Sequence, residues 1–254
     1  VGGSVSYAVL SQCVLFLTVL IHEFGHGSMT RHIGGSIDRI LLWPLGGICF
    51  SVMPRAGSAR EKVVNDLKVV AAGPATHWVQ TPVWVGLLAA LYPAVDIWQF
   101  LNPFSSISVP AVYLRRPLDW LCIAVIGSAV SINVSLFIFN AFLPMYPLDA
   151  AKLFTSFLQL KLAMTPYQTA GWLVNVSGFC CVGFLVHAAF QVTQGTTYSV
   201  SLLIGVMCLS ETWKIKNLRD SGRLSCHPLF EHADDVAGAN ENITRSPLVS
   251  DSRV

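Results

Sequence analysis

Charged residues are scarce in this chain, and their scarcity is the first constraint on its fold. Only 12% of the 254 residues are charged, whereas 53% are hydrophobic; an average soluble domain has about 25% charged residues. Four long stretches contain no Asp, Glu, Lys or Arg: residues 1–22, 69–95, 121–148 and 162–210. Each is long enough to supply the roughly 20 apolar residues that cross a bilayer. This composition excludes a soluble enzyme, and a net charge of only +2 indicates no nucleic-acid surface.

Paired cysteines are also missing. The seven cysteines are an odd number and contain no C-x-x-C pair. Most of them lie in or beside apolar segments, where cysteine behaves as a small hydrophobic residue. We therefore expect neither a disulfide framework nor a cysteine metal cluster.

The uncharged stretches predict an all-α polytopic membrane protein with about five or six transmembrane segments. Hydrophobic segments lie near residues 3–30, 66–92, 118–142, 166–190 and 197–213. We expect a transmembrane domain at 1–216, with its core at 5–160, and a polar, disordered cytoplasmic tail at 217–254. The sequence implies a lipid bilayer as surroundings and no particular oligomeric state.

The distribution of basic residues predicts the orientation in the membrane. Between residues 31 and 68 there are six basic and three acidic residues. Lys and Arg are enriched in short cytoplasmic loops, so this loop is predicted to be cytoplasmic, together with the end of the first span.

The motif that carries chemistry is His22-Glu23-Phe24-Gly25-His26. Positions i and i+4 of a helix share one face, so both imidazoles can reach one ion while Glu23 lies beside it. The alternative is a pair of buried histidines without a ligand. Ionisable side chains are costly in an uncharged membrane segment, however, and there they usually mark a functional site.

A catalytic zinc ion usually has three protein ligands and an open position for water. Asp149 is the only acidic residue between Asp119 and Glu211, and it follows the prolines at 144 and 147. Three successive spans would return the chain to the depth of the two histidines, so Asp149 is the candidate third ligand. It could also cap a short helix near 148–160, and the two roles are compatible.

Residues 35–51 have a pattern unlike the helical segments. Two short apolar runs flank the turn residues Pro44-Leu45-Gly46-Gly47, which predicts a membrane-associated β-hairpin. An open strand edge there could pair with an unwound substrate segment, because strand addition satisfies backbone groups that lipid cannot. The alternative is an interfacial loop anchored by Trp43.

Three blocks in this order resemble the site-2 protease group of intramembrane metalloproteases. They are H-E-F-G-H at 22–26, the glycines at 34–35 followed by P-L-G-G at 44–47, and P-x-x-P-L-D at 144–149. The resemblance covers roughly residues 5–160. It implies one zinc ion held by His22, His26 and Asp149, Glu23 as the catalytic base, and a transmembrane protein as substrate.

The chain departs from the usual pattern of this group at three places. Leu148-Asp149 is followed by two alanines instead of two glycines, and the Gly-Pro-x-x-Asn motif ends in His77 instead of asparagine. Asn140, the asparagine before the prolines, lies about one residue further upstream than in the commonest form of the pattern. His77 falls at a depth comparable with the predicted metal site. We expect it to support a ligand or contact substrate, the alternative being a simple bond to a nearby carbonyl. Asn140, Gly46 and Gly47 are further candidates for substrate binding or support.

The sequence therefore predicts a zinc metalloendopeptidase that cuts within or near a transmembrane segment, with its active site toward the cytoplasm. The main alternative is a catalytically inactive, protease-like scaffold that binds client proteins. A metal transporter is a further alternative, but it would need polar residues along a whole pathway, whereas here they gather at one depth.

Overall fold

The computed structural model describes residues 2–43, 46–102, 109–194 and 200–230, and helices make up most of it. The chain forms two compact units. Unit 1 holds residues 1–55 and 65–143, and unit 2 holds residues 56–64 and the chain from Pro144 onward. Each unit has a hydrophobic core of its own.

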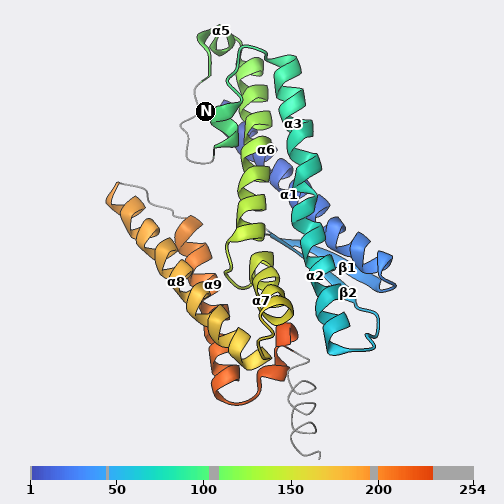
Figure 1. Cartoon of the computed structure of the whole chain (residues 1–254). Helices are drawn as coiled ribbons and strands as arrows, with labels where there is room; N and C mark the ends of the chain where they lie inside the picture. The colour runs from blue at the N-terminus through green and yellow to red at the C-terminus, as the bar shows by residue number, and fades with distance from the viewer. Residues whose placement is uncertain (1, 44–45, 103–108, 195–199, 231–254) are drawn as a thin grey trace, which may run out of the picture. The chain divides into compact units, whose positions relative to one another are not determined.

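Unit 1 is organised around α1 (Gly2–His32), α3 (His77–Leu91) and α6 (Pro117–Phe142). Both α1 and α3 pack against α6, and Figure 1 shows α3 and α6 running side by side. Short helices α4 (Trp98–Leu101) and α5 (Ala111–Leu114) lie between α3 and α6 in the chain.

The helix that precedes α3 ends at a proline-containing turn. α2 (Ala59–Ala75) contains Pro74, which has no backbone N–H to donate to the preceding turn. The N–H of Thr76 instead donates to the carbonyl of Gly73, at 3.0 Å. The predicted span at 66–92 is therefore two helices that meet at Thr76.

A small antiparallel sheet completes unit 1. β1 (Ser36–Trp43) pairs with β2 (Gly46–Val52), with Leu41 opposite Ile48. This confirms the predicted hairpin, although Pro44 and Leu45 lie outside the described residues. The hairpin packs against α1 because Gly27 has no side chain: a Cβ there would lie 2.6 Å from Ile37 Cδ1.

The core of unit 1 lies between α3, the segment after it, and α6. Aromatic and aliphatic side chains from these elements exclude solvent from the bundle, and Phe100 packs directly over Gly127. The buried members are Leu88, Tyr92, Val95, Phe100, Ile123, Ile126 and Val130.

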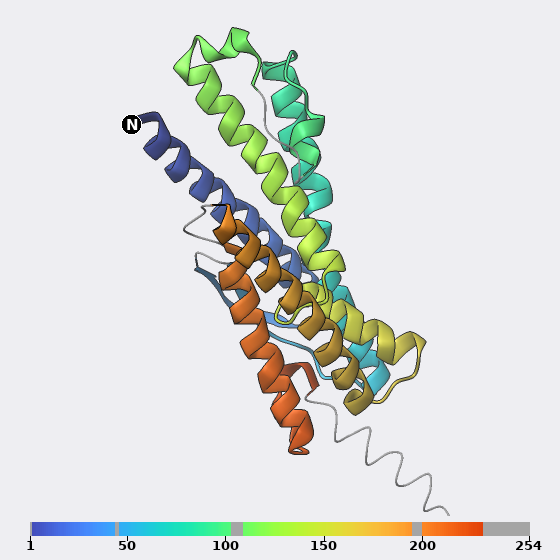
Figure 2. The same cartoon turned by 90° about the vertical axis from the view of Figure 1, so that its left-hand side faces the viewer.

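Unit 2 contains α7 (Asp149–Lys161), α8 (Pro166–Thr193) and α9 (Val200–Asp220), followed by the 3₁₀ turns η1 (Leu224–Cys226) and η2 (Pro228–Phe230). The helices α8 and α9 run side by side (Figure 2). A Thr165–Gln168 capping box begins α8, which satisfies backbone groups at its N-terminus.

The two 3₁₀ turns fold back onto the helices of unit 2. Leu224 and Phe230 are fully buried there, in a core shared with Leu173 and Ile215. Burial lowers the pKa of His227, whose Nδ1 accepts a hydrogen bond from the backbone N–H of Leu229. Residues 231–254 of the predicted tail lie outside the described part of the chain, and the predicted domain boundary at 217 stays a prediction.

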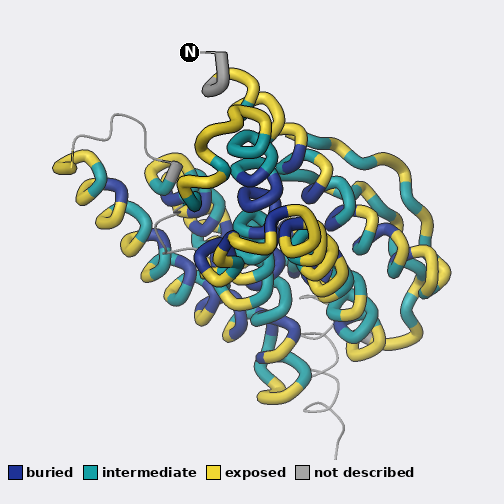
Figure 3. Tube along the Cα trace, turned by 90° about the horizontal axis from the view of Figure 1, so that it is seen from above, coloured by how far each residue is buried: buried dark blue, intermediate teal, exposed yellow. Residues whose placement is uncertain are grey.

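Three described helices are long and apolar enough to cross a membrane: residues 5–32, 117–142 and 166–193. They match the first, third and fourth predicted spans. Exposed and buried positions alternate along the long helices (Figure 3), and many exposed positions are large and apolar, such as Val83 on α3 and Phe179 on α8. Apolar surface of this extent marks contact with a membrane or another apolar partner. The fold is mostly helical with one small sheet, as predicted, while the total number of spans stays a prediction.

Two substitutions on α8 test the packing of the unit 2 core. We expect Leu173→Ala to destabilise the protein by about 2–5 kcal/mol, because Leu173 is fully buried and its loss leaves a cavity. The midpoint of thermal denaturation in detergent measures the change. Phe179→Ala on the same helix removes more atoms from a side chain that is 80% exposed, and it should shift the midpoint far less. Equal shifts would contradict this packing.

Candidate metal centre

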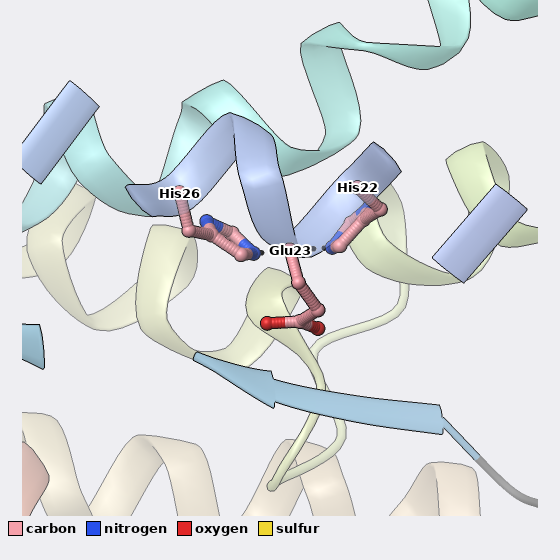
Figure 4. A group of neighbouring side chains, drawn as sticks. All are labelled: His22, Glu23 and His26. Carbon is pink, nitrogen blue, oxygen red and sulfur yellow. Dashed lines mark hydrogen bonds between the residues drawn. The ribbon is translucent and has the colours of Figure 1, made fainter. Parts of the chain in front are cut away.

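The C-terminal half of α1 brings His22, Glu23 and His26 together (Figure 4). The spacing of four residues places the two imidazoles one above the other on one helix face. Their Nε2 atoms are 3.1 Å apart. All three side chains are buried in unit 1, with at most 9% of their surface exposed. The geometry predicted from the H-E-x-x-H spacing is therefore present.

The Nδ1 atom of each ligand candidate has its own partner. His26 Nδ1 donates to the backbone carbonyl of Val69, at 2.8 Å. His22 Nδ1 lies 3.2 Å from Nε2 of His77. A carbonyl can only accept, so His26 carries its ring proton on Nδ1 and its Nε2 lone pair is directed at His22.

This arrangement fits a zinc ion. Two nitrogens about 2.0–2.1 Å from a tetrahedral zinc ion lie about 3.3 Å from each other, close to the separation of the Nε2 atoms. The ligand atoms of His22, Glu23 and His26 all lie within 4.8 Å of one another, and no other such group of three occurs in the described ranges. Facing lone pairs repel unless a cation or proton lies between them, which favours a metal at this position.

Gly73 forms the wall opposite the two imidazoles. A Cβ at this position would overlap the His26 ring and lie 2.7 Å from His22 Nε2. Only a glycine leaves the space between the two Nε2 atoms and α2 open. The Gly-Pro pair at 73–74 therefore lies in the last turn of α2 and also shapes the centre.

The hairpin passes close to Glu23. A Cβ on Gly47 would lie 2.6 Å from Glu23 Cγ and 2.9 Å from Val19 Cγ1, so β2 approaches the carboxylate because residue 47 has no side chain. Cys49 is on the same strand. Burial raises the pKa of its thiol, and the Glu23 carboxylate raises that pKa further. Both effects stabilise the neutral thiol over the thiolate.

Asp149 lies in unit 2, as the first residue of α7, so its predicted role as third ligand stays a prediction. It is 6% exposed, and its Oδ1 lies 3.5 Å from Nζ of Lys152. A carboxylate in the first turn is also favoured by the helix dipole.

Hydrogen bonds hold the turn before Asp149 within unit 2. The backbone N–H of Tyr146 donates to Ser177 Oγ, at 3.3 Å, and Ser177 Oγ lies 2.6 Å from Thr212 Oγ1. Thr212 in turn donates to the Cys208 carbonyl, at 2.7 Å. Both hydroxyl residues are buried, so α8 and α9 together fix the position of this turn.

The remaining predicted residues lie in unit 1. His77 contacts His22 directly, and Gly46 is the first residue of β2, with a φ of 155°. Asn140 lies near the end of α6, where its Nδ2 donates to the carbonyl of Leu136, at 3.0 Å. The roles predicted for Asn140 and Gly46 stay predictions.

Sequence reasoning missed four residues around the centre. Gly73 and Val69 support the imidazoles directly, and Asn133 and Thr18 lie behind His77. Asn133 had a usable signal, because a polar side chain in the middle of an uncharged helix needs a partner. The contribution of Val69 is a backbone carbonyl, which leaves no mark on the sequence.

Comparison with known proteins agrees with this geometry. The family model described as Peptidase family M50 matches residues 11–185, more than half of the chain. The chain belongs to peptidase family M50. This confirms the resemblance to the site-2 protease group, and the matched region includes the whole of the α1 motif and Asp149.

A curated relative of this M50 protein is a zinc metalloprotease of Methanocaldococcus jannaschii. The two are 25% identical over 161 residues, which is 63% of this chain and 37% of the relative. The chain thus spans well under half the length of that relative. The family and the name of the relative support a metallopeptidase that uses zinc.

A substitution of Gly73 tests its close packing against the two imidazoles. We expect Gly73→Ala to reduce the zinc content of the purified protein by about tenfold or more, because its methyl group would occupy space beside both Nε2 atoms. Metal analysis of the protein by mass spectrometry measures this. Gly86→Ala on α3 is the matched control, since a Cβ there meets nothing within 4 Å. Zinc content at the native level in the Gly73 variant would contradict the assigned geometry.

Proposed function

We propose that this M50 protein is an intramembrane zinc metalloendopeptidase that hydrolyses a peptide bond within or near a transmembrane segment of another membrane protein. The observation that carries the proposal is the pair of buried Nε2 atoms 3.1 Å apart on an apolar helix, with the Glu23 carboxylate beside them. The separation of the two Nε2 atoms suits two ligands of one tetrahedral zinc ion, and the H-E-x-x-H spacing supports that assignment.

In this proposal His22 and His26 hold one zinc ion through Nε2, and Asp149 supplies the third ligand. When bound, the ion supplies Lewis acidity, which lowers the pKa of a water molecule from 15.7 to about 7 and polarises a peptide carbonyl. Glu23 does not need to be a ligand, because two imidazoles and one carboxylate complete the usual catalytic set.

Glu23 then acts as the base. Its carboxylate accepts a proton from the attacking water and donates it to the amine nitrogen of the leaving peptide. The close approach of Gly47 keeps the space around the carboxylate narrow, which restricts the orientations of Glu23. No covalent enzyme intermediate is required.

The hairpin is the proposed substrate-binding element. A helical substrate protects its carbonyls with internal hydrogen bonds, so the cleaved segment has to unwind before it reacts. An unwound segment can pair with a free strand edge, which satisfies its backbone groups in lipid. The approach of β2 to Glu23 at Gly47 would keep a paired segment near the base.

The proposed surroundings follow from the charge distribution and the apolar helices. The His26 end of α1 leads to the loop rich in Lys and Arg, which supports a multi-pass protein with its centre toward the cytoplasmic side. The substrate is then cut near the cytoplasmic end of its span.

The base can be tested by a substitution that preserves shape. We expect Glu23→Gln to lower the cleavage rate by about 10²–10⁴-fold, because an amide cannot accept the proton, while the zinc content stays near native. The assay is cleavage of a single-span reporter, with glycines at the cytoplasmic end of its helix, by purified protein in vesicles.

Glu61→Gln is the matched control, because Glu61 lies at the exposed start of α2. A zinc chelator should abolish cleavage by the native chain, and added zinc should restore it. Equal cleavage by native and Glu23→Gln protein would overturn the peptidase proposal, as would zinc binding by the native chain without cleavage of any reporter in a panel.

The third ligand can be tested separately. We expect Asp149→Asn to weaken zinc binding by more than the roughly 10–100-fold that loss of an outer partner costs, because a ligand itself is lost. Asp119→Asn is the matched control, since Asp119 also lies in the first turn of a helix. Zinc affinity is measured by competition with a fluorescent chelator; an unchanged affinity would assign the third ligand elsewhere.

A further inference from the structure

The amide of Asn133 on α6 has a fixed orientation. Its Nδ2 donates to the carbonyl of Ala129, at 2.9 Å, and approaches Thr18 Oγ1, at 3.4 Å. The opposite orientation would direct Oδ1 at the Ala129 carbonyl with no proton between the two oxygens. The Oδ1 atom is therefore the one that faces His77 Nδ1, at 2.8 Å.

This orientation determines the tautomers of two histidines in sequence. Asn133 Oδ1 can only accept, so His77 carries a proton on Nδ1 and has a lone pair on Nε2. That lone pair faces His22 Nδ1, at 3.2 Å, and accepts its proton. Nε2 of His22 is then left with a lone pair that points toward Nε2 of His26.

This hydrogen-bond network begins and ends on α1, which carries both His22 and Thr18. His77 is 2% exposed, Thr18 is 1% exposed and Asn133 is fully buried, so water does not compete for these bonds. Thr18 precedes His22 by four residues and lies on the same face of α1. Side chains from α1, α3 and α6 thus form a ring of contacts at the depth of the centre.

We propose that Asn133, with Thr18 behind it, is a positioning residue that acts through His77 to hold the His22 ring in its metal-binding tautomer and orientation. The proposal rests on the proposed zinc site and adds residues to it. A histidine ligand commonly donates its other ring proton to an outer partner, and loss of such a partner costs about 10–100-fold in metal affinity. Here the outer partner of His22 is His77, and Asn133 orients His77.

The test measures zinc affinity and stability separately. We expect Asn133→Leu and His77→Phe each to weaken zinc binding by about 10–100-fold in chelator competition. The double variant should bind zinc no more weakly than His77→Phe, because the two residues act in series on His22. The Co²⁺-loaded variants should also show altered visible absorption bands, since the His22 ring is less constrained.

Stability distinguishes positioning from a structural role. Asn133→Leu alone leaves the His77 Nδ1–H buried without an acceptor, which lowers the melting temperature of the zinc-free protein. The double variant removes that donor, so its melting temperature should move back toward native while its zinc affinity stays low. If Asn133→Leu alone fails to fold, the double variant still tests the proposal.

Ser131→Ala is the control on the same helix. It removes a single hydrogen bond, from Ser131 Oγ to the Phe100 carbonyl, outside the ring of contacts, and zinc affinity should not change. Native zinc affinity in Asn133→Leu, or recovery of affinity together with stability in the double variant, would overturn the inference.

The inference and the proposed function fail in different ways. A native chain that binds zinc and cleaves reporters, but whose Asn133 variant does both equally well, disproves the inference alone. A native chain whose zinc affinity depends on Asn133, but which cleaves at the same rate with Glu23→Gln, disproves the peptidase proposal alone.

Discussion

The facing lone pairs of His22 and His26 Nε2 are the constraint on which unit 1 depends. Polar atoms buried in an apolar bundle need partners, and each imidazole has one behind it: a carbonyl for His26 and a second histidine for His22. The glycine at 73 and the helix break at Thr76 follow from the same need, because they bring α2 and α3 close enough to supply these partners.

Short-range patterns in the sequence were sufficient for the local elements. The i, i+4 spacing placed His22 and His26 on one face, and the turn residues at 44–47 marked the hairpin, because both depend on backbone geometry within a few residues. The span at 66–92 was predicted as one segment because hydropathy does not detect a break; the Gly-Pro pair at 73–74 carried that information. The contact between His77 and Asn133 could not be predicted, since the two residues are 56 positions apart in sequence and meet only through the register between α3 and α6.

The departure from the family pattern at residue 77 has a physical counterpart in the structure. Where the resemblance leads one to expect asparagine, His77 accepts from His22 at one ring nitrogen and donates to Asn133 at the other.

In unit 2 the Ser177–Thr212 pair connects the turn before Asp149 to α8 and α9. These two helices lie largely beyond the three sequence blocks, so the turn that carries the acidic candidate is fixed by parts of the chain that the motifs do not include.

The two histidines differ in how their support is encoded. His26 donates to the main-chain oxygen of Val69, which every amino acid at position 69 would provide. His22 depends on the identities of two further side chains. In this chain, substitutions of side chains can therefore disturb the support of the first histidine, whereas the support of the second survives any substitution that leaves the backbone in place.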